Sequence, residues 1–203
     1  MAGTFSEQDR TLLYSLIARR RSVRDYDDSA VSQQALMRIL EGAQGVTDHD
    51  GGRGAPSAHA LHPLGLTVIA RRIQDVTPAI YGFDADSHQL NRQGELPAAG
   101  SLLQVSLADD VWLESAAAII VITADHERAL GHFADQQPDG KRGARYIDVE
   151  AGAVAQSLYL ATLVEGLGGV LVMGVDDQAL ARLLPLPPAH RAVALFCLGQ
   201  CQS

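Results

Sequence analysis

Residues 116–123 read AAAIIVIT and carry no charged side chain. A strand this apolar has no face suited to water, so we expect it in the centre of a sheet that is covered on both faces. Asp86 and Ser87 supply turn residues for a hairpin between residues 80 and 90. Further short apolar runs predict strands over residues 64–70, 170–175 and 192–198.

Apolar residues at helical spacing predict the segments that cover the sheet. Helices are expected over residues 7–20, 32–43, 124–133, 145–167 and 176–184. They bracket the strands without the regular alternation of a parallel βαβ fold, which favours an α+β fold with a mixed central sheet flanked by helices. Since no repeat or linker divides the chain, residues 1–203 are predicted to form a single domain.

Composition narrows the class of protein. The chain has 203 residues, 47% of them hydrophobic, and a formal net charge of −8. This acidity argues against nucleic acid or an anionic membrane as partner, because both bind excess Lys and Arg. No signal pattern opens the sequence, and the longest apolar stretch, 151–175, is interrupted by Gln156, Glu165 and glycines, so no membrane span is expected.

The number of cysteines indicates the cellular compartment. Only Cys197 and Cys201 are present, so no disulfide framework can form and a cytoplasmic protein is expected. The C-x3-C spacing suits a redox or metal pair. However, no second pair completes a zinc site, and the apolar run around Cys197 favours a core residue.

An arginine segment is the first candidate for chemistry. Arg19, Arg20, Arg21 and Arg24 fall within six residues of an acidic protein, and Ser22 adds a hydroxyl donor. Arginine forms bidentate bonds to phosphate oxygens and stays charged, so the cluster suits a phosphate anchor. The alternative is a solvated helix end, where cations complement the helix dipole without any ligand.

A proline-flanked segment at 55–63, APSAHALHP, is the second candidate. Its prolines fix the path of the chain, and Ser57 with the small alanines would let a flat ring approach the backbone. An ordinary structured loop is the alternative. His49, His59 and His62 could also be metal ligands, but no Cys, Asp or Glu stands at ligand spacing, so no metal site is expected.

The glycine-rich stretch 166–175, GLGGVLVMGV, is the third candidate. Its glycines close a helix and open a strand, the reverse of a dinucleotide-binding fingerprint. Gly166 and Gly168 are therefore interpreted as a helix C-cap. Gly174, expected inside a strand, indicates close approach by a ligand or by another backbone.

Taken in order, these segments resemble the FMN-dependent nitroreductase superfamily, and most closely its branch of SagB-type and thiazole/oxazole peptide dehydrogenases. The family's R-R-S-x-R element is matched by residues 20–24, and its P-S-A-x-A-L-x-P-L element by residues 56–64. An R-Y-x-x-x-E-x-G-x-x-x-Q element followed by L-Y-L-A is matched by residues 145–161. The G-L-G element, apolar strand and D-D pair match residues 166–177.

The resemblance implies a nitroreductase-like fold in an intertwined homodimer that binds FMN. It assigns the FMN phosphate to Arg20, Arg21, Ser22 and Arg24. It places the backbone of Val172, Met173 and Gly174 near the isoalloxazine ring. It also implies that four residues of the second segment reach the flavin that the other subunit mainly binds: Pro56, Ser57, Ala58 and His59. The helix over 145–167 would form the dimer core through its small residues Ala151, Gly152, Ala155 and Ala161.

The function implied is an FMN-dependent oxidoreductase that uses NAD(P)H to reduce a nitroaromatic, quinone or similar small acceptor in two half-reactions. No catalytic acid or base stands out; Arg145 and Tyr146 are the candidates, with a structural role favoured. One alternative is a SagB-type dehydrogenase or oxidase of a biosynthetic pathway. However, Pro138 and Asp139 stand where azoline-oxidising members carry Lys-Tyr, which argues against azoline oxidation. A flavin-binding or interaction protein without catalysis is the third alternative.

Overall fold

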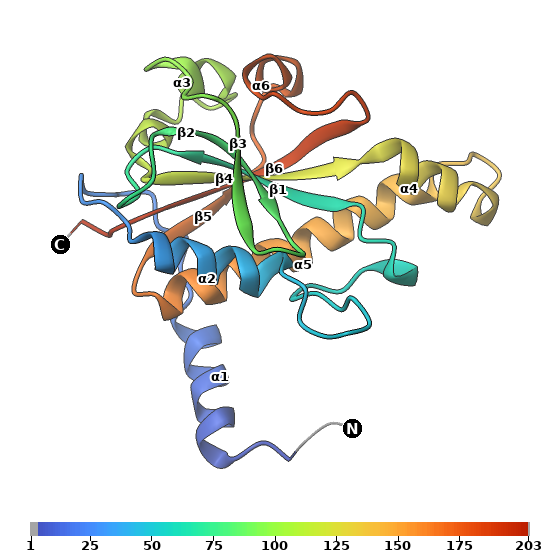
Figure 1. Ribbon diagram of the computed structural model, residues 1–203, viewed down its shortest axis with the longest axis horizontal. Helices are drawn as coiled ribbons and strands as arrows, with labels where there is room; N and C mark the ends of the chain where they lie inside the picture. Colours follow the sequence, from blue (N-terminus) through green and yellow to red (C-terminus); the bar gives the residue numbers. More distant parts are fainter. Residues whose placement is uncertain (1–3, 203) are drawn as a thin grey trace.

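A six-stranded sheet lies between two layers of helices in the computed structural model, which describes residues 4–202 (Figure 1). The strands, in the spatial order β3-β2-β1-β4-β6-β5, are β1 (Leu64–Ala70), β2 (Ala79–Asp84), β3 (Gln89–Glu95), β4 (Ala118–Asp125), β5 (Gly168–Val172) and β6 (His190–Gly199). The α-helices are α1 (Glu7–Arg19), α2 (Gln33–Gln44), α3 (Ser101–Val105), α4 (His126–His132), α5 (Arg142–Val164) and α6 (Asp177–Leu183). Three 3-10 turns complete the elements: η1 (Ala58–Ala60), η2 (Val111–Ser115) and η3 (Ala134–Gln136).

The strand predicted from AAAIIVIT is β4, and it lies inside the sheet between β1 and β6. Its side chains alternate between two buried clusters, as the pleat of a strand requires. Ile120 and Ile122 belong to the cluster that includes α2 and α5 residues. Ile119 and Val121 belong to the cluster on the side of α3 and α6. The central position and the covering of both faces are therefore confirmed.

The α+β class is confirmed, but the expected mixed sheet is wrong. All five strand pairs of the sheet are antiparallel. β4 and β5 do run in the same direction, because both are antiparallel to β6, yet β6 lies between them. The crossover through α5 thus skips one position in the sheet, and the last strand fills that position in the opposite direction.

The glycine-rich stretch differs from its prediction at two points. Gly166 adopts a left-handed φ of 73° just after α5 and ends the helix, as expected. Gly168 does not cap the helix but opens β5, where an added Cβ would lie 2.6 Å from Val23 and 2.8 Å from the Cys201 sulfur. The strand ends at Val172, so Gly174 lies beyond it.

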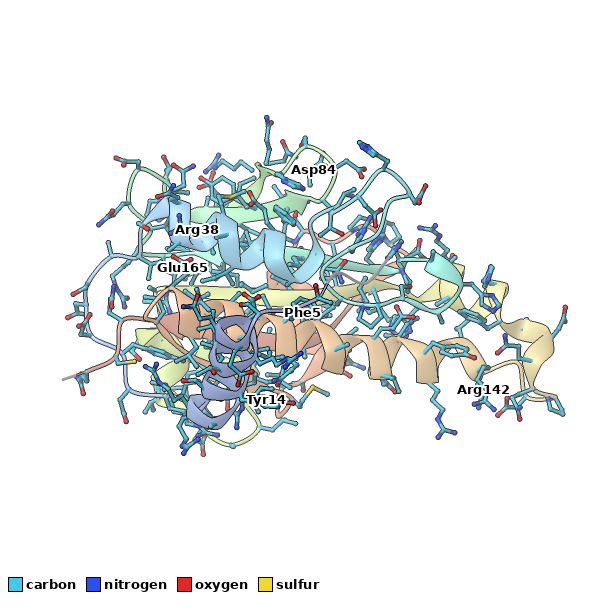
Figure 2. The ribbon with its side chains drawn as sticks, turned by 90° about the horizontal axis from the view of Figure 1, so that it is seen from below. Phe5, Tyr14, Arg38, Asp84, Arg142 and Glu165 are labelled. Carbon is cyan, nitrogen blue, oxygen red and sulfur yellow. The ribbon has the colours of Figure 1, made fainter. Side chains whose placement is uncertain are left out.

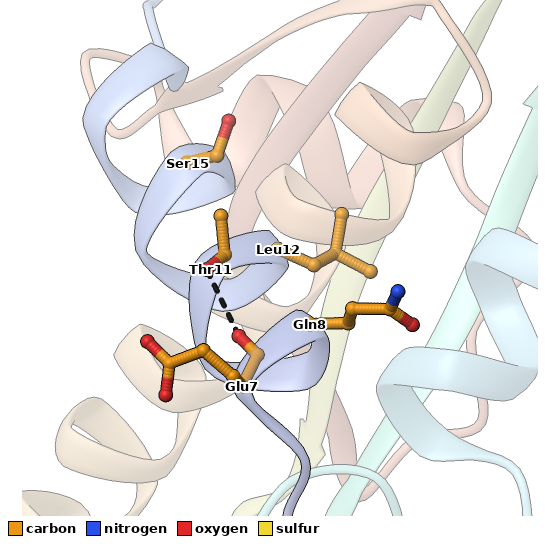
Figure 3. Close-up of a pocket in the computed structure, with 5 residues that line it drawn as sticks. All are labelled: Glu7, Gln8, Thr11, Leu12 and Ser15. Carbon is orange, nitrogen blue, oxygen red and sulfur yellow. Dashed lines mark hydrogen bonds between the residues drawn. The ribbon is translucent and has the colours of Figure 1, made fainter.

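α1 begins as its sequence predicts but buries none of its residues. Ser6 caps it, in a reciprocal pair with Asp9. The helix extends away from the sheet, and Tyr14 on it is 70% exposed (Figures 1 and 2). Further apolar residues on and before it are also exposed: Phe5, Leu12, Leu13 and Ile17. A hollow on this helix is open to solvent and lined by Glu7, Gln8, Thr11, Leu12 and Ser15 (Figure 3).

α5 is the long helix of the layer below the sheet. It buries Ile147, Val154 and Leu158 in the same cluster as α2 and the sheet. Among residues 4–202 it is the one helix that is long and apolar enough to cross a membrane by length and composition. Its packing against α2, α4 and the sheet is that of a core helix.

A bidentate ion pair joins α2 to the end of α5. Arg38 donates from Nε and Nη2 to the two carboxylate oxygens of Glu165, at 2.8 and 2.6 Å (Figure 2). Hydrogen bonding from Arg38 lowers the pKa of Glu165 below its ordinary value. A carboxylate with a lowered folded-state pKa contributes stability above its unfolded pKa, and that contribution is lost as the pH falls through the folded pKa.

We therefore expect Glu165→Gln to lower the melting temperature at pH 7, and to lower it progressively less as the pH falls from the ordinary pKa of a glutamate through the lower folded-state pKa. Melting curves of wild type and variant across this pH range measure the difference. Glu127→Gln, at an exposed carboxylate on α4, is the control. A wild-type advantage that does not shrink as the pH falls through the folded-state pKa would contradict the expectation.

Candidate functional site

The arginine segment leaves α1 and packs against the C-terminal half of α5. Arg20 caps α1, and its guanidinium lies over the ring of Tyr159, 4.8 Å from the centroid. The Ser22 hydroxyl is 3.1 Å from the Tyr159 hydroxyl. Arg20 and Ser22, two of the residues predicted to hold a phosphate, are therefore positioned by one aromatic side chain.

Tyr159 also connects this segment to the edge strand β5. The backbone N–H of Leu171 donates to the Tyr159 hydroxyl at 2.9 Å. The backbone N–H of Val23 donates to the carbonyl of Gly169 at 3.0 Å. The arginine segment thus lies along β5, whose C-terminal end leads into Met173 and Gly174.

The guanidinium groups of the segment take different partners. Arg21 donates from Nη1 to the carbonyls of Ala18 and Arg20, at 2.9 and 2.8 Å. That is the helix-end role named as the alternative for this segment. Arg24 lies over the ring of Trp112, 5.7 Å from its centroid. The structure brings Arg20 and Ser22 together and directs Arg24 toward η2.

A pocket opens between the arginine segment and the start of β5. Its lining consists of Arg19, Arg20, Arg21, Val23, Tyr159, Thr162, Leu163, Leu167, Gly168, Gly169 and Cys201. Thr162 is 1% exposed, and its hydroxyl has no hydrogen-bond partner among the described residues. The pocket therefore combines arginine side chains with backbone of the first residues of β5.

The end of β5 carries the third predicted set. Val172 is buried, whereas Met173 is 62% exposed and Gly174 is exposed. The Gly174 carbonyl accepts from the Leu107 N–H at 2.9 Å. An added Cβ at Gly174 would meet nothing within 4 Å, so nothing else in the described chain crowds this position.

The Pro56–His59 segment is held against the N-terminal half of α5. Buried Glu150 accepts from the backbone N–H of Ala58 at 2.7 Å, and the Ser57 hydroxyl accepts from the N–H of His62 at 2.8 Å. His59 and His62 have left-handed φ values of 54° and 49°. Such angles cost energy in residues with a Cβ, so these bonds hold a strained turn in place.

His59 lies in an aromatic cluster at the end of α4. Its Nδ1 is 3.0 Å from Nε2 of His132, and its ring centroid is 5.2 Å from that of Phe133. Phe133 in turn contacts Tyr146, with 4.3 Å between centroids. The Tyr146 hydroxyl donates to Gln136, and Arg145 is exposed beside it on α5. The structure thus gathers His59 and Tyr146, which the sequence had placed in separate motifs.

The two groups of candidate residues lie apart within one chain. Tyr159 and Tyr146 are 13 residues apart on α5, about 20 Å along the helix axis at 1.5 Å per residue. The phosphate candidates contact the first, and the Pro56–His59 segment lies near the second. No group of three His, Cys, Asp or Glu side chains within residues 4–202 is arranged to hold a metal.

The comparisons with known proteins agree with this fold. A family model described as "Nitroreductase family" matches residues 17–200. The chain belongs to the nitroreductase family. A Methanocaldococcus jannaschii protein named as a nitroreductase is 32% identical over 174 residues, covering 86% of this chain and 84% of that protein. Family membership identifies the protein as an oxidoreductase.

Solved structures share the fold at low sequence identity. The E. coli microcin synthetase McbBCD complex superposes with a TM-score of 0.76 at 19% identity, covering 100% of this chain and 75% of that chain. The NADPH:FMN oxidoreductase of Vibrio harveyi superposes with a TM-score of 0.66 at 22% identity, covering 95% and 70%. At these identities the likeness is one of fold.

Three residues that contribute to the candidate site of this nitroreductase-family protein were missed from the sequence. Tyr159 stood within the L-Y-L-A element, but nothing in its spacing showed that its hydroxyl reaches β5. His132 and Phe133 belong to no motif, and they meet His59 only because α4 folds back beside the turn. An aromatic residue within a family element was the one available signal for Tyr159.

Replacing Tyr159 by Phe removes the acceptor for the Leu171 N–H and the partner of Ser22. We expect a loss of about 1–2 kcal/mol in unfolding free energy, because a half-buried donor is left unpaired. Amide hydrogen exchange at Leu171 should accelerate. Tyr146→Phe, which removes the other tyrosine hydroxyl of the same helix, is the matched control and should leave Leu171 unchanged. Equal exchange at Leu171 in wild type and Tyr159→Phe would contradict this role.

Proposed function

We propose that this nitroreductase-family protein is a cytoplasmic, single-domain FMN oxidoreductase that uses NAD(P)H to reduce a nitroaromatic, quinone or similar small acceptor. The observation that carries the proposal is the placement of Arg20 and Ser22 on Tyr159, beside β5. This arrangement offers a charged anion site at one end of an edge strand and an open backbone at the other. The printed name of the Vibrio harveyi neighbour, an NADPH:FMN oxidoreductase, supports the same pair of cofactors.

The donor set fits a phosphate group. Arg20 and Arg24 supply fixed positive charge, and Ser22 supplies a hydroxyl. Guanidinium and hydroxyl donors are the groups that bind phosphate oxygens most strongly in proteins. Arg21 would join them by exchanging its bonds to the helix-end carbonyls for bonds to the anion.

Each part of the chain has a separate task in this proposal. When bound, FMN would supply the hydride and electron transfer, since such cofactors carry the redox chemistry themselves. Arg20, Ser22 and Arg24 would hold its phosphate, and the backbone at Val172–Gly174 would line its ring system. Tyr146 has a structural role in this proposal, because its hydroxyl donates to Gln136 and its ring contacts Phe133. Exposed Arg145 beside it is assigned no catalytic step.

A second copy of the chain would complete the site. The Pro56–His59 turn cannot reach the Arg20 region of its own chain, so we propose that it serves the partner's flavin in a homodimer. α5 leaves Val149, Gly152 and Val164 exposed, and the apolar residues of α1 are exposed as well. In a symmetric dimer, the exposed residues of α5 and α1 would be covered by the same two helices of the partner.

Gly152 tests the dimer, because an added Cβ there would meet nothing within 4 Å of its own chain. We expect wild type to sediment as a dimer. The dissociation constant of the Gly152→Trp dimer should be at least about tenfold higher, because the new side chain would occupy space that the partner fills. Gly131→Trp, at an exposed and equally open glycine of α4, is the control. A Gly152→Trp dimer as tight as wild type would refute this interface.

The visible spectrum of the purified protein tests the function. We expect a yellow protein that releases FMN on heating and bleaches rapidly under anaerobic conditions when NADH or NADPH is added. A protein that stays colourless after incubation with FMN would exclude the flavoenzyme and favour an interaction protein.

A substrate-oxidising dehydrogenase of the SagB-type branch is the second candidate. It is favoured by the order of the R-R-S-x-R, P-S-A and R-Y elements along the chain. A yellow protein that neither nicotinamide bleaches, but that a product-forming substrate does, would establish it in place of the reductase.

A further inference from the structure

Two histidines from separate elements meet at the Pro56–His59 turn. Nδ1 of His59 lies 3.0 Å from Nε2 of His132, the last residue of α4. At this distance one nitrogen donates a hydrogen bond and the other accepts it, so the pair holds a proton between its two rings. Both side chains are exposed, and the bond uses only one nitrogen of His59. The other nitrogen, Nε2, lies on the far side of the ring and is left for a further partner.

Packing fixes the two rings in this arrangement. Phe133 is buried, and its ring centroid lies 5.2 Å from that of His59 and 4.6 Å from that of His132. His59 has a left-handed φ of 54°, a strained conformation of the kind that is found most often at functional sites. Glu150 of α5 holds the same turn through the Ala58 N–H. The His59 imidazole is therefore placed by α4 and α5 together.

His59 differs in one property from every other residue proposed to contact the flavin. Arginine keeps its proton at any working pH, whereas imidazole exchanges a proton between about pH 5 and 8. The other proposed contacts carry no group that titrates in this range: Arg20, Arg21, Ser22, Arg24, Pro56, Ser57, Ala58, Val172, Met173 and Gly174. A step at this site that needs a proton near neutral pH can take it from His59.

His62, on the same turn, is not suited to this role. Burial lowers the pKa of His62. The charges of Arg53 and Arg128 lower it further, while Glu150 of α5 acts in the opposite direction. His62 is therefore unprotonated near neutral pH. The remaining ionisable group beside the pair is Tyr146 of α5, which faces it through Phe133.

We propose that His59 donates a proton to the acceptor that is reduced at the partner's flavin, and that His132 positions His59 and returns its proton. This role rests on the proposed function and deepens it, because it specifies acceptors whose oxygen gains a proton, such as quinones. Two-electron reduction of a quinone adds a hydride, which the bound reduced flavin supplies, and a proton. The Nε2–H bond of His59 breaks as the O–H bond of the product forms. Nδ1 of His59 then takes the proton of His132 Nε2, and solvent protonates the exposed His132.

Two acceptors test the proton transfer, because p-benzoquinone takes up protons with its electrons and ferricyanide takes up an electron alone. We expect photoreduced, FMN-bound His59→Gln to react with benzoquinone about tenfold more slowly than wild type, and with ferricyanide at the wild-type rate. Positioned proton donors typically contribute more, but this pair is exposed, so water can donate in its place. His49→Gln, at an exposed histidine of the loop before the turn, is the control. Equal benzoquinone rates in wild type and His59→Gln, or an equal loss with both acceptors, would overturn the proposal.

The pH dependence and chemical rescue test the role of His132. The benzoquinone rate of wild type should fall from about pH 6 to pH 8, where imidazoles lose their protons, and that of His59→Gln should stay level. His132→Gln can still hydrogen-bond to His59 Nδ1, but its amide cannot pass on a proton. Imidazole added to the buffer should therefore raise the benzoquinone rate of His132→Gln and leave that of wild type unchanged. A slow His132→Gln protein that imidazole does not rescue would show that His132 has a structural role only.

Mixed dimers test which subunit supplies the histidine. When His59→Gln and Arg20→Ala chains are co-expressed, one site of each mixed dimer combines the Arg20 of the first chain with the His59 of the second. At FMN concentrations that fill only the sites with Arg20, the mixture should reduce benzoquinone faster than either variant alone. No recovery in the mixture would overturn delivery from the partner.

Nitrogen NMR on the flavin-free protein separates this inference from the proposed function. Labelled wild type, measured in the cold, should show a scalar coupling between His59 Nδ1 and His132 Nε2 through the shared proton. The two glutamine variants assign the signals, and absence of the coupling would refute the pair. A protein that shows the coupling but binds no FMN would refute the proposed function and the transfer to an acceptor together. An FMN-bound protein in which His59→Gln has no effect specific to benzoquinone would refute the proton transfer alone.

Discussion

Replacing Arg20 by alanine is expected to weaken FMN binding by about 10- to 100-fold, the largest functional effect of any single substitution that we propose. A hydrogen bond to a charged group contributes about 1.5–3 kcal/mol, and this variant removes both the charge and the group stacked on Tyr159. Fluorescence titration of the apoprotein with FMN measures the affinity. Arg20→Lys should be intermediate, because it keeps the charge but loses the bidentate geometry.

Arg182→Ala is the matched control for this variant. It removes an exposed arginine from α6, a helix on the opposite face of the sheet from α5, and should leave the affinity unchanged. If Arg20→Ala bound FMN as tightly as wild type, the arginine segment would be the solvated helix end that Arg21 already resembles. The phosphate would then have to bind elsewhere.

Gly143→Ala is expected to destabilise the protein, although it adds only one methyl group. Gly143 lies where α5 passes α4, and an added Cβ would collide with backbone atoms of Ala129 and lie 2.7 Å from the backbone nitrogen of Leu130. Backbone cannot move aside as a side chain can, so the helices must separate. Overpacking of this kind costs about 1–3 kcal/mol, partly offset by about 1 kcal/mol of helix propensity.

Thermal denaturation measures this effect, at about 2–4 °C per kcal/mol for a chain of this size. Gly131→Ala on α4 is the control, because a Cβ there would meet nothing within 4 Å. It should keep or raise the melting temperature. A Gly143→Ala protein that melts with wild type would show that α4 and α5 are less closely packed than the structure describes.

Local patterns in the sequence predicted most of the elements, with α3 missed, but not how the elements are arranged. β1 has its predicted bounds, and β4 lies where its apolarity placed it, because burial is visible in composition. The direction of β6 between β4 and β5 depends on a pairing between segments far apart in the chain, so the mixed sheet was a wrong expectation. The spacing of apolar residues did not predict that α1 is exposed either, because an apolar helix face predicts a contact but not whether that contact lies in the same chain.

The candidate site was predictable to a similar depth. Arginine chemistry predicted an anion anchor at Arg20, Arg21 and Arg24, but the backbone carbonyls that Arg21 takes up, and the ring under Arg24, are known only from three dimensions. Glu150 and Tyr159 stood inside motifs whose spacing shows that they are nine positions apart on one helix. In the structure Glu150 holds the Pro56–His59 turn, whereas Tyr159 contacts Ser22 and Leu171. The helical pattern does not predict where the segments that they contact lie.

The projecting helix α1 has a consequence for any measurement made on this protein. Because it buries none of its apolar residues on its own chain, it adds little to the folding of an isolated protomer. If a second copy covers it, that part of the free energy obeys mass action. Dilution would then lower the apparent melting temperature, so stabilities of variants are comparable only at matched protein concentration.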